Sequence, residues 1–136
     1  IQVGIKLAQE AGAKRAIKLA VSIGAHSPLM EPASAAFRQA LLATTFHEAA
    51  FVVYGNVDAA PLADVDATRR ELDLQLTHSV RWTESVQAMV AAGVEHFIEL
   101  GPKDVLTGLL KRIDRSRTGI PLNSATAVKQ FADANR

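Results

Sequence analysis

Apolar and polar positions alternate along the chain with two different periods, and each period predicts a different kind of element. Apolar residues that recur every three or four positions predict helices. The expected helices run from the first residue to about Gly12, from Met30 to about Thr45, from a cap at Asp66 or Thr68, from Thr83 to Gly93, from a cap at Asp104, and from Ser124 onward. Short runs of apolar and β-branched residues predict strands at 17–21, 51–54, 96–100 and 118–122. Helices and strands therefore alternate with short connections, which is typical of an α/β fold with a parallel sheet and flanking helices.

The chain begins within a helical pattern. Its first residue is Ile1 rather than Met, and Val3 and Leu7 already occur at helical spacing. Because a native helix usually begins with a capping residue, this start predicts further sequence upstream, although a trimmed terminus would look the same. The first helix and strand could belong to a separate small subdomain.

Composition narrows the class of protein. The 136 residues are 49% hydrophobic and 21% charged, with a net charge of +1, which is typical of one globular domain or a large piece of one. The balanced charge gives no reason to expect a nucleic acid partner, since phosphate binding needs an excess of Lys and Arg. The absence of cysteine excludes disulfides and thiolate chemistry, and it fits a cytoplasmic location. No apolar run approaches the roughly 18 residues of a membrane helix, so no membrane partner is expected.

Several catalytic and binding motifs are absent from the sequence. Neither glycine-rich nucleotide motif occurs, so no phosphate cradle is expected. His47 and Glu48 begin a zinc-protease motif, but Phe51 stands where its second histidine belongs, so no metal site is expected. A Gly-x-Ser-x-Gly turn is also missing, and the chain therefore offers no nucleophilic serine of that kind.

The loop at 24–30 is the segment that most favours chemistry. His26 follows a predicted strand in a tight run of small residues and directly precedes a helix start. Such a position projects a side chain from the carboxyl edge of a sheet, where α/β proteins keep their active sites. A histidine there suits general acid–base catalysis. From spacing alone, however, a lone loop histidine is more often a surface or hydrogen-bonding residue.

Several separate segments together resemble one enzyme family. They are residues 11–16 (AGAKRA), 25–30 (AHSPLM), 55–59 (GNVDA), 80–86 (VRWTESV), 97–102 (FIELGP) and 105–109 (VLTGL). These segments occur in the order found in malonyl-CoA:acyl carrier protein transacylases. The resemblance extends over nearly the whole chain, but it covers only the C-terminal half of the family's catalytic domain.

This resemblance implies an activity, partners and a fold. Family members transfer a malonyl group from coenzyme A to the phosphopantetheine thiol of acyl carrier protein in fatty acid biosynthesis, through an acyl-serine intermediate and without a cofactor of their own. The implied partners are acyl carrier protein, a coenzyme A thioester and the N-terminal half of the same enzyme. The implied fold is an α/β-hydrolase-like large subdomain with an inserted ferredoxin-like one. Residues 1–21 would end the small subdomain, and residues 22–136 would belong to the large one.

The resemblance also implies roles for particular residues. His26 matches the general base, and the backbone carbonyl of Gln75 matches the acceptor that orients it; a solvated helix end is the alternative for Gln75. Asn56 could lie at the mouth of the site, or it could be only a turn residue. Ala25 replaces a phenylalanine common in the family, which leaves malonyl or methylmalonyl preference open. Lys103 replaces a glycine of the family, so the turn at 101–104 is expected to differ locally.

The chain lacks the rest of the family's machinery. The serine nucleophile, the oxyanion-loop glutamine and the arginine that binds the malonyl carboxylate all belong upstream, so this chain alone is predicted to be inactive. Two alternatives remain open at this point. The chain could be a non-catalytic binding or scaffold module derived from the same fold, or a piece of a polyketide synthase acyltransferase.

Overall fold

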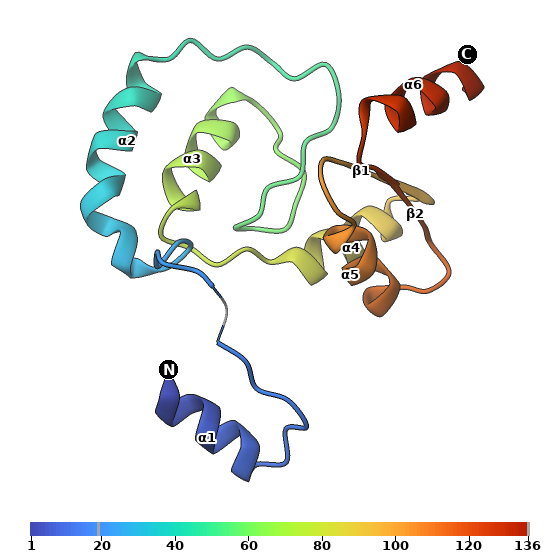
Figure 1. Ribbon diagram of the computed structural model, residues 1–136. Helices are drawn as coiled ribbons and strands as arrows, with labels where there is room; N and C mark the ends of the chain where they lie inside the picture. Colours follow the sequence, from blue (N-terminus) through green and yellow to red (C-terminus); the bar gives the residue numbers. More distant parts are fainter. Residues whose placement is uncertain (19, 136) are drawn as a thin grey trace.

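The computed structural model describes residues 1–18 and 20–135, which form a mixed α/β structure. Along the chain the elements are α1 (Gln2–Glu10), the 3₁₀ turn η1 (Pro28–Met30), α2 (Glu31–Ala43), α3 (Val65–Gln75), α4 (Trp82–Ala91), β1 (His96–Leu100), α5 (Val105–Ile113), β2 (Thr118–Leu122) and α6 (Ala125–Ala134). Helices α2 and α3 lie side by side, whereas α4, α5 and the strands form a second group (Figure 1). Within the described residues α1 contacts no other helix or strand, and it stands apart in Figure 1.

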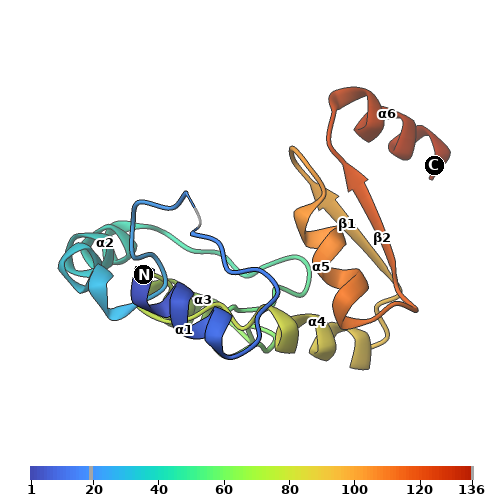
Figure 2. The same ribbon diagram turned by 60° about the horizontal axis from the view of Figure 1, so that its bottom comes forward.

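The two strands pair in parallel around a helical crossover. Their register joins His96 to Thr118 at one end and Leu100 to Leu122 at the other. Helix α5 lies against one face of this pair, and α6 follows the end of β2 (Figure 2). Close packing of α5 depends on Gly119, because an added Cβ would lie 2.5 Å from Cγ2 of Thr107. No helix in the described part of the chain is long and apolar enough to span a bilayer.

A small core lies where α4, α5 and the strands meet. Val86 on α4 is fully buried, and Leu110 on α5 is 1% exposed. Beside them Ser85 is buried, and its hydroxyl donates to the carbonyl oxygen of Arg81 at 3.0 Å. Burial of these side chains between the two helices and the sheet supplies the hydrophobic stabilisation that holds this half of the molecule together.

The start of α5 is held by a carboxylate from the neighbouring strand. Asp104 occupies the N-cap position, as predicted, but its side chain makes no capping hydrogen bond. Glu99 supplies the acceptor instead, since its carboxylate accepts the N–H groups of Leu106 at 3.0 Å and Thr107 at 2.8 Å. The Thr107 hydroxyl donates to the same carboxylate at 2.6 Å. The hydrogen bond from that hydroxyl and those from the backbone N–H groups lower the pKa of Glu99 below its ordinary value of 4.5.

This lowered pKa predicts a specific loss of stability in acid. A carboxyl whose folded pKa is depressed stabilises the fold above its unfolded pKa, and this contribution disappears as the pH falls through the folded value. The destabilisation caused by Glu99→Gln is therefore expected to be largest near neutral pH and to shrink progressively below about pH 4.5. Urea unfolding at a series of pH values measures it. Glu95→Gln, at the exposed position directly before β1, is the control; an equal pH dependence for both variants would contradict the assignment.

Two predicted strands do not form. Residues 17–18 and 20–21 contain no strand, Ile17 and Val21 are 58% and 63% exposed, and Leu19 lies outside the described residues. At 51–54 only an isolated antiparallel bridge joins Tyr54 to Pro61, so the expected strand is wrong there as well. The physical reason is that a strand needs a neighbour to receive its backbone hydrogen bonds, and no further strand of the described residues lies beside either segment.

Predicted helix starts are corrected at two places and confirmed at a third. Helix α3 begins after Asp64, whose carboxylate accepts the N–H of Ala67 at 2.7 Å, rather than after Asp66 or Thr68. Helix α4 begins at Trp82 with Arg81 as its N-cap, not with a cap at Thr83. Helix α6 begins next to Ser124 as expected, with that residue as its N-cap, because the Ser124 hydroxyl oxygen accepts the N–H of Ala127. At α3 the error arises because Asp64, Asp66 and Thr68 are all residue types that can cap a helix, whereas α4 begins without a side-chain cap.

The turn at 101–104 has Lys103 where the family resemblance implies a glycine. Lys103 itself adopts the left-handed conformation, with φ of +75°, and it follows Gly101 at φ of +136°. The turn between β1 and α5 therefore places a lysine in a conformation that costs a side-chain-bearing residue about 1 kcal/mol.

Candidate functional site

His26 lies on a short loop whose conformation is fixed by its neighbours. The hydroxyl of Ser27 donates to the carbonyl oxygen of Gly24 at 2.6 Å and accepts the N–H of Leu29 at 3.3 Å, which caps η1. Gly24 permits this closure, because a Cβ there would lie 3.0 Å from Cδ1 of Leu29. His26 has φ of +60°. Such strain in a non-glycine residue persists only where its surroundings hold it, and it concentrates at functional sites.

The imidazole of His26 is oriented by the end of α3. Its Nδ1 lies 2.9 Å from the carbonyl oxygen of Gln75, 49 positions later in the sequence. A carbonyl oxygen can only accept, so Nδ1 carries a hydrogen, and in the neutral imidazole Nε2 then holds the lone pair. Gln75 is the last residue of α3, where backbone carbonyls have no partner within the helix and are free to accept from elsewhere. The ring is exposed, so Nε2 is available to an approaching group.

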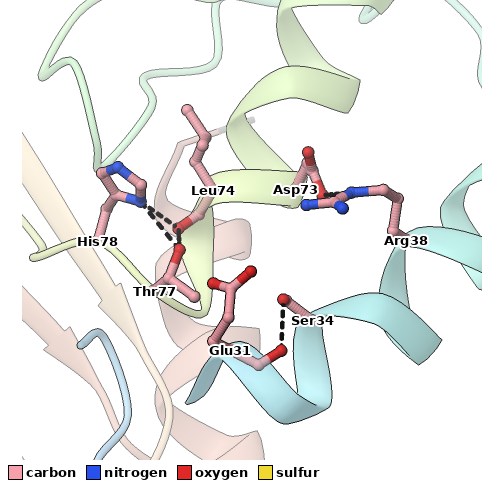
Figure 3. Close-up of polar contacts among 7 residues, drawn as sticks. All are labelled: Glu31, Ser34, Arg38, Asp73, Leu74, Thr77 and His78. Atoms are coloured by element: carbon pink, nitrogen blue, oxygen red, sulfur yellow. Dashed lines mark hydrogen bonds and ion pairs between the residues drawn. The ribbon is translucent and has the colours of Figure 1, made fainter. Parts of the chain in front are cut away.

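Helix α3 is itself fixed against α2, the helix that follows the His26 loop. Arg38 on α2 pairs with Asp73 on α3 through a 2.7 Å contact between Nε and Oδ1 (Figure 3). Arg69 on α3 reaches back to the end of α2 and donates to the carbonyl oxygens of Leu41 at 3.0 Å and Thr44 at 3.1 Å. These contacts hold α3, which ends at Gln75, against α2, which follows the His26 loop.

A turn at 55–57 holds the Gln75 end of α3 from the other side. The side-chain amide of Asn56 donates to Oε1 of Gln75 at 3.4 Å, and the carbonyl oxygen of Asn56 accepts the N–H of Arg81 at 2.9 Å. Oε1 of Glu71 accepts the N–H of Asn56 at 2.7 Å and that of Val57 at 3.1 Å. Asn56 therefore contacts Gln75, the residue whose carbonyl oxygen binds His26. The φ of Asn56 is not positive, in contrast to that of Ala59 in the same loop.

Sequence reasoning did not single out Glu71. It lies in a run of charged residues on α3 that is typical of a solvated helix face, yet it is only 8% exposed. Its one signal in the sequence is the four-residue spacing to Gln75, which places both side chains on the same face of the helix.

A second histidine near α3 makes a superficially similar bond. Nδ1 of His78 lies 3.1 Å from the carbonyl oxygen of Leu74 and 3.0 Å from the Thr77 hydroxyl (Figure 3). Both partners are within four positions of it in the sequence. This contact is thus a local feature of the helix end, whereas that of His26 joins two distant parts of the chain.

The arrangement can move a proton, but it holds no nucleophile that His26 is seen to activate. Ser27 is adjacent, yet its hydroxyl is committed to Gly24 and to the turn of η1. Ala25, directly before the histidine, is exposed. Among the residues that the structure describes, no group of three or more potential ligands could bind a metal ion.

Comparison with known proteins relates this chain to one group of enzymes. It is 45% identical over 118 residues to the malonyl CoA-acyl carrier protein transacylase of Escherichia coli strain K12, which covers 87% of this chain and 38% of that protein. It is 36% identical over 129 residues to the protein of the same name from Bacillus subtilis strain 168, which covers 95% of this chain and 41% of that one. The chain thus spans about two fifths of the length of these curated relatives. No family model matches it.

Solved structures give the same relation. A malonyl-CoA:acyl carrier protein transacylase from Xanthomonas oryzae superposes with a TM-score of 0.89 at 37% identity, over 98% of this chain and 42% of that chain. A malonyl-transacylase in complex with a type II polyketide acyl-carrier protein superposes with a TM-score of 0.90 at 36% identity, over 98% and 43% of the two chains.

Proposed function

This chain belongs to the malonyl CoA-acyl carrier protein transacylase family, and we propose on that premise that it supplies the proton-transferring histidine of a malonyl transferase. The observation that carries the proposal is the hydrogen bond between His26 and the carbonyl oxygen of Gln75, which leaves Nε2 ready to accept a proton. The remaining catalytic groups, including the serine nucleophile, would come from the N-terminal half of the same enzyme. The chain by itself is then inactive.

The chemistry proceeds in two matched halves. Nε2 of His26 takes the proton of the serine hydroxyl while the serine oxygen attacks the thioester carbonyl of malonyl-CoA. The C–S bond breaks, and the coenzyme A sulfur leaves with the proton returned by His26. In the second half, His26 takes the proton of the phosphopantetheine thiol, whose sulfur attacks the carbonyl carbon of the acyl-serine. The ester C–O bond then breaks, and the serine oxygen recovers a proton from His26. Throughout, the Gln75 carbonyl oxygen keeps the ring aligned by accepting from Nδ1.

The proposed domain arrangement follows from the same relation. Residues 1–21 would end a small ferredoxin-like subdomain, and residues 22–136 would complete an α/β-hydrolase-like large subdomain. The separation of α1 from every other described element supports the boundary. A parallel pair of strands with a crossover helix is also a unit from which larger parallel sheets are built, which supports the assignment of the second part.

The proposed partners are a coenzyme A thioester and an acyl carrier protein, which carries the phosphopantetheine, so the enzyme needs no cofactor of its own. The similarity to a transacylase in complex with a polyketide carrier protein supports a carrier from either fatty acid or polyketide synthesis. With Ala25 beside the histidine, we expect malonyl and methylmalonyl to be discriminated only modestly. A cytoplasmic location remains a prediction.

Intact mass spectrometry of the complete gene product tests this function. Incubation with malonyl-CoA is expected to add the mass of one malonyl group, and subsequent addition of a phosphopantetheine-bearing carrier protein is expected to remove it. A complete product that gains no adduct, or one that never passes its adduct to a carrier, would contradict the proposal. It would favour a binding or scaffold role.

A further inference from the structure

Glu71 is a buried carboxylate that the reaction described above does not use. It projects from the middle of α3 and is 8% exposed, and both of its carboxylate oxygens accept hydrogen bonds from the backbone of another segment. Oε1 accepts the N–H groups of Asn56 and Val57 at 2.7 and 3.1 Å, and Oε2 lies 3.3 Å from the N–H of Val57. Hydrogen bonds from N–H groups to a carboxylate are among the stronger ones in proteins, so the 55–57 turn is firmly tied to α3.

The approach between Glu71 and this turn is close enough to require a glycine. A Cβ on Gly55 would lie 2.6 Å from Oε2 of Glu71 and 2.9 Å from its carboxyl carbon. Gly55 is buried, and its N–H donates to the carbonyl oxygen of Ala60 at 2.9 Å, which closes the loop on itself. The carboxylate therefore rests directly on a rigid piece of backbone.

That backbone in turn holds the residue that orients the histidine. The side-chain amide of Asn56 donates to Oε1 of Gln75, and the backbone carbonyl oxygen of Asn56 accepts the N–H of Arg81. Gln75 and Arg81 are the two ends of the connection between α3 and α4, so Asn56 fixes both of them. The carbonyl oxygen of Gln75, which accepts from His26, belongs to the first of these ends.

We propose that Glu71 is a positioning residue: by holding Asn56, it fixes the Gln75 carbonyl oxygen and thereby keeps His26 with its hydrogen on Nδ1. The consequence for turnover rests on the proposed function, whereas the consequence for the histidine tautomer does not. Loosening this support by a fraction of an ångström weakens the 2.9 Å hydrogen bond between Nδ1 of His26 and the Gln75 carbonyl oxygen. The ring hydrogen can then move to Nε2, which no longer has a lone pair to accept the proton.

The test uses the complete protein with ¹⁵N-labelled histidine. Ring ¹⁵N chemical shifts report which nitrogen of His26 carries the hydrogen, and steady-state kinetics report malonyl transfer. Glu71→Leu and Asn56→Ala are both expected to lower the Nδ1–H fraction of His26 and to reduce kcat by roughly tenfold to a hundredfold, with KM for malonyl-CoA little changed. Glu71→Gln keeps one oxygen that can accept from Asn56, so it is expected to stay nearer the parent protein in both measurements.

Asp66→Asn is the matched control, because it also removes a carboxylate from α3 but at an exposed position in the first turn. It is expected to change neither the tautomer nor kcat. If Glu71→Leu and Asn56→Ala lower only thermal stability and leave the His26 ring signals unchanged, the positioning role is wrong. If the parent protein transfers no malonyl group but the variants still shift the tautomer, the positioning stands and the proposed function fails. Asn56→Ala keeps the test decisive should Glu71→Leu not fold.

Discussion

Replacing His26 by alanine in the complete protein is expected to lower kcat/KM for malonyl transfer by about 10² to 10⁴-fold. The reason is that, in the proposed reaction, the variant has no group to take the serine proton as the oxygen attacks, while substrate-binding contacts elsewhere are untouched. The side chain is exposed, so its removal leaves no cavity in the core, and the melting temperature is expected to change little. Steady-state transfer from malonyl-CoA to a carrier protein, with a thermal melt of the same sample, measures both effects.

His78→Ala provides the comparison that makes this result specific. His78 also places Nδ1 near a carbonyl oxygen at the end of α3, and it is also exposed, but its partners are local in the sequence. Its removal is expected to leave kcat/KM within about twofold, which corresponds to a surface substitution of less than 0.5 kcal/mol. Equal losses in the two variants would contradict the assignment of His26 as the base.

Gly119→Ala is expected to destabilise the fold by about 1–3 kcal/mol, because it forces extra volume into a closely packed contact. The new Cβ would lie 2.5 Å from Cγ2 of Thr107 and 3.3 Å from Cδ2 of Leu110. Thr107 cannot turn aside, since its hydroxyl and N–H are both bound to Glu99. Leu110 is 1% exposed and is equally confined. The change must therefore push α5 away from β2, and urea unfolding of the complete protein would show a lower midpoint.

Gly108→Ala, on α5 itself, is the opposite case. Nothing lies within 4 Å of a Cβ built there, and the position is inside α5. Alanine is expected to stabilise the helix by about 0.5–1 kcal/mol, because it restricts the unfolded chain more than glycine does. A stabilising Gly119→Ala, or a destabilising Gly108→Ala, would show that the packing of α5 on the strands is not as described.

The second half of the chain was predictable from its sequence, for a physical reason. β1, α5, β2 and α6 are formed by nearby residues, and each begins or ends at a strong local signal such as Ser124. The strands expected at 17–21 and 51–54 failed because an apolar run indicates that a face seeks burial without saying which segment will cover it. The sequence also could not choose between Asp64 and its acidic and hydroxyl neighbours as the cap of α3.

The residues of the candidate site were also only partly predictable from the sequence. His26 was singled out by its place in a loop before a helix, but its role and its pairing with Gln75 came from family resemblance, since no periodicity connects residues 49 positions apart. Glu71 was not predicted as a site residue, because the charged residues around it in the sequence are typical of a solvated helix face. Its burial against Gly55 shows that it packs on the turn that contacts Gln75. Buried carboxylates that satisfy backbone N–H groups are set by tertiary packing, which a single sequence does not display.

The long span of the His26–Gln75 bond also bears on which part of the molecule fails first. The parallel strands pair His96 with Thr118 across a single helix, whereas His26 and Gln75 enclose α2 and the whole 44–64 connection. Closing a longer loop costs more chain entropy, by about 0.6 kcal/mol for each doubling of its length, and proteins open locally where such contacts are few. A brief opening around α2 would therefore break the hydrogen bond between His26 and Gln75 while the β1–α5–β2 unit stays folded. The contact that orients His26 is then expected to be lost more easily than the pairing of β1 with β2.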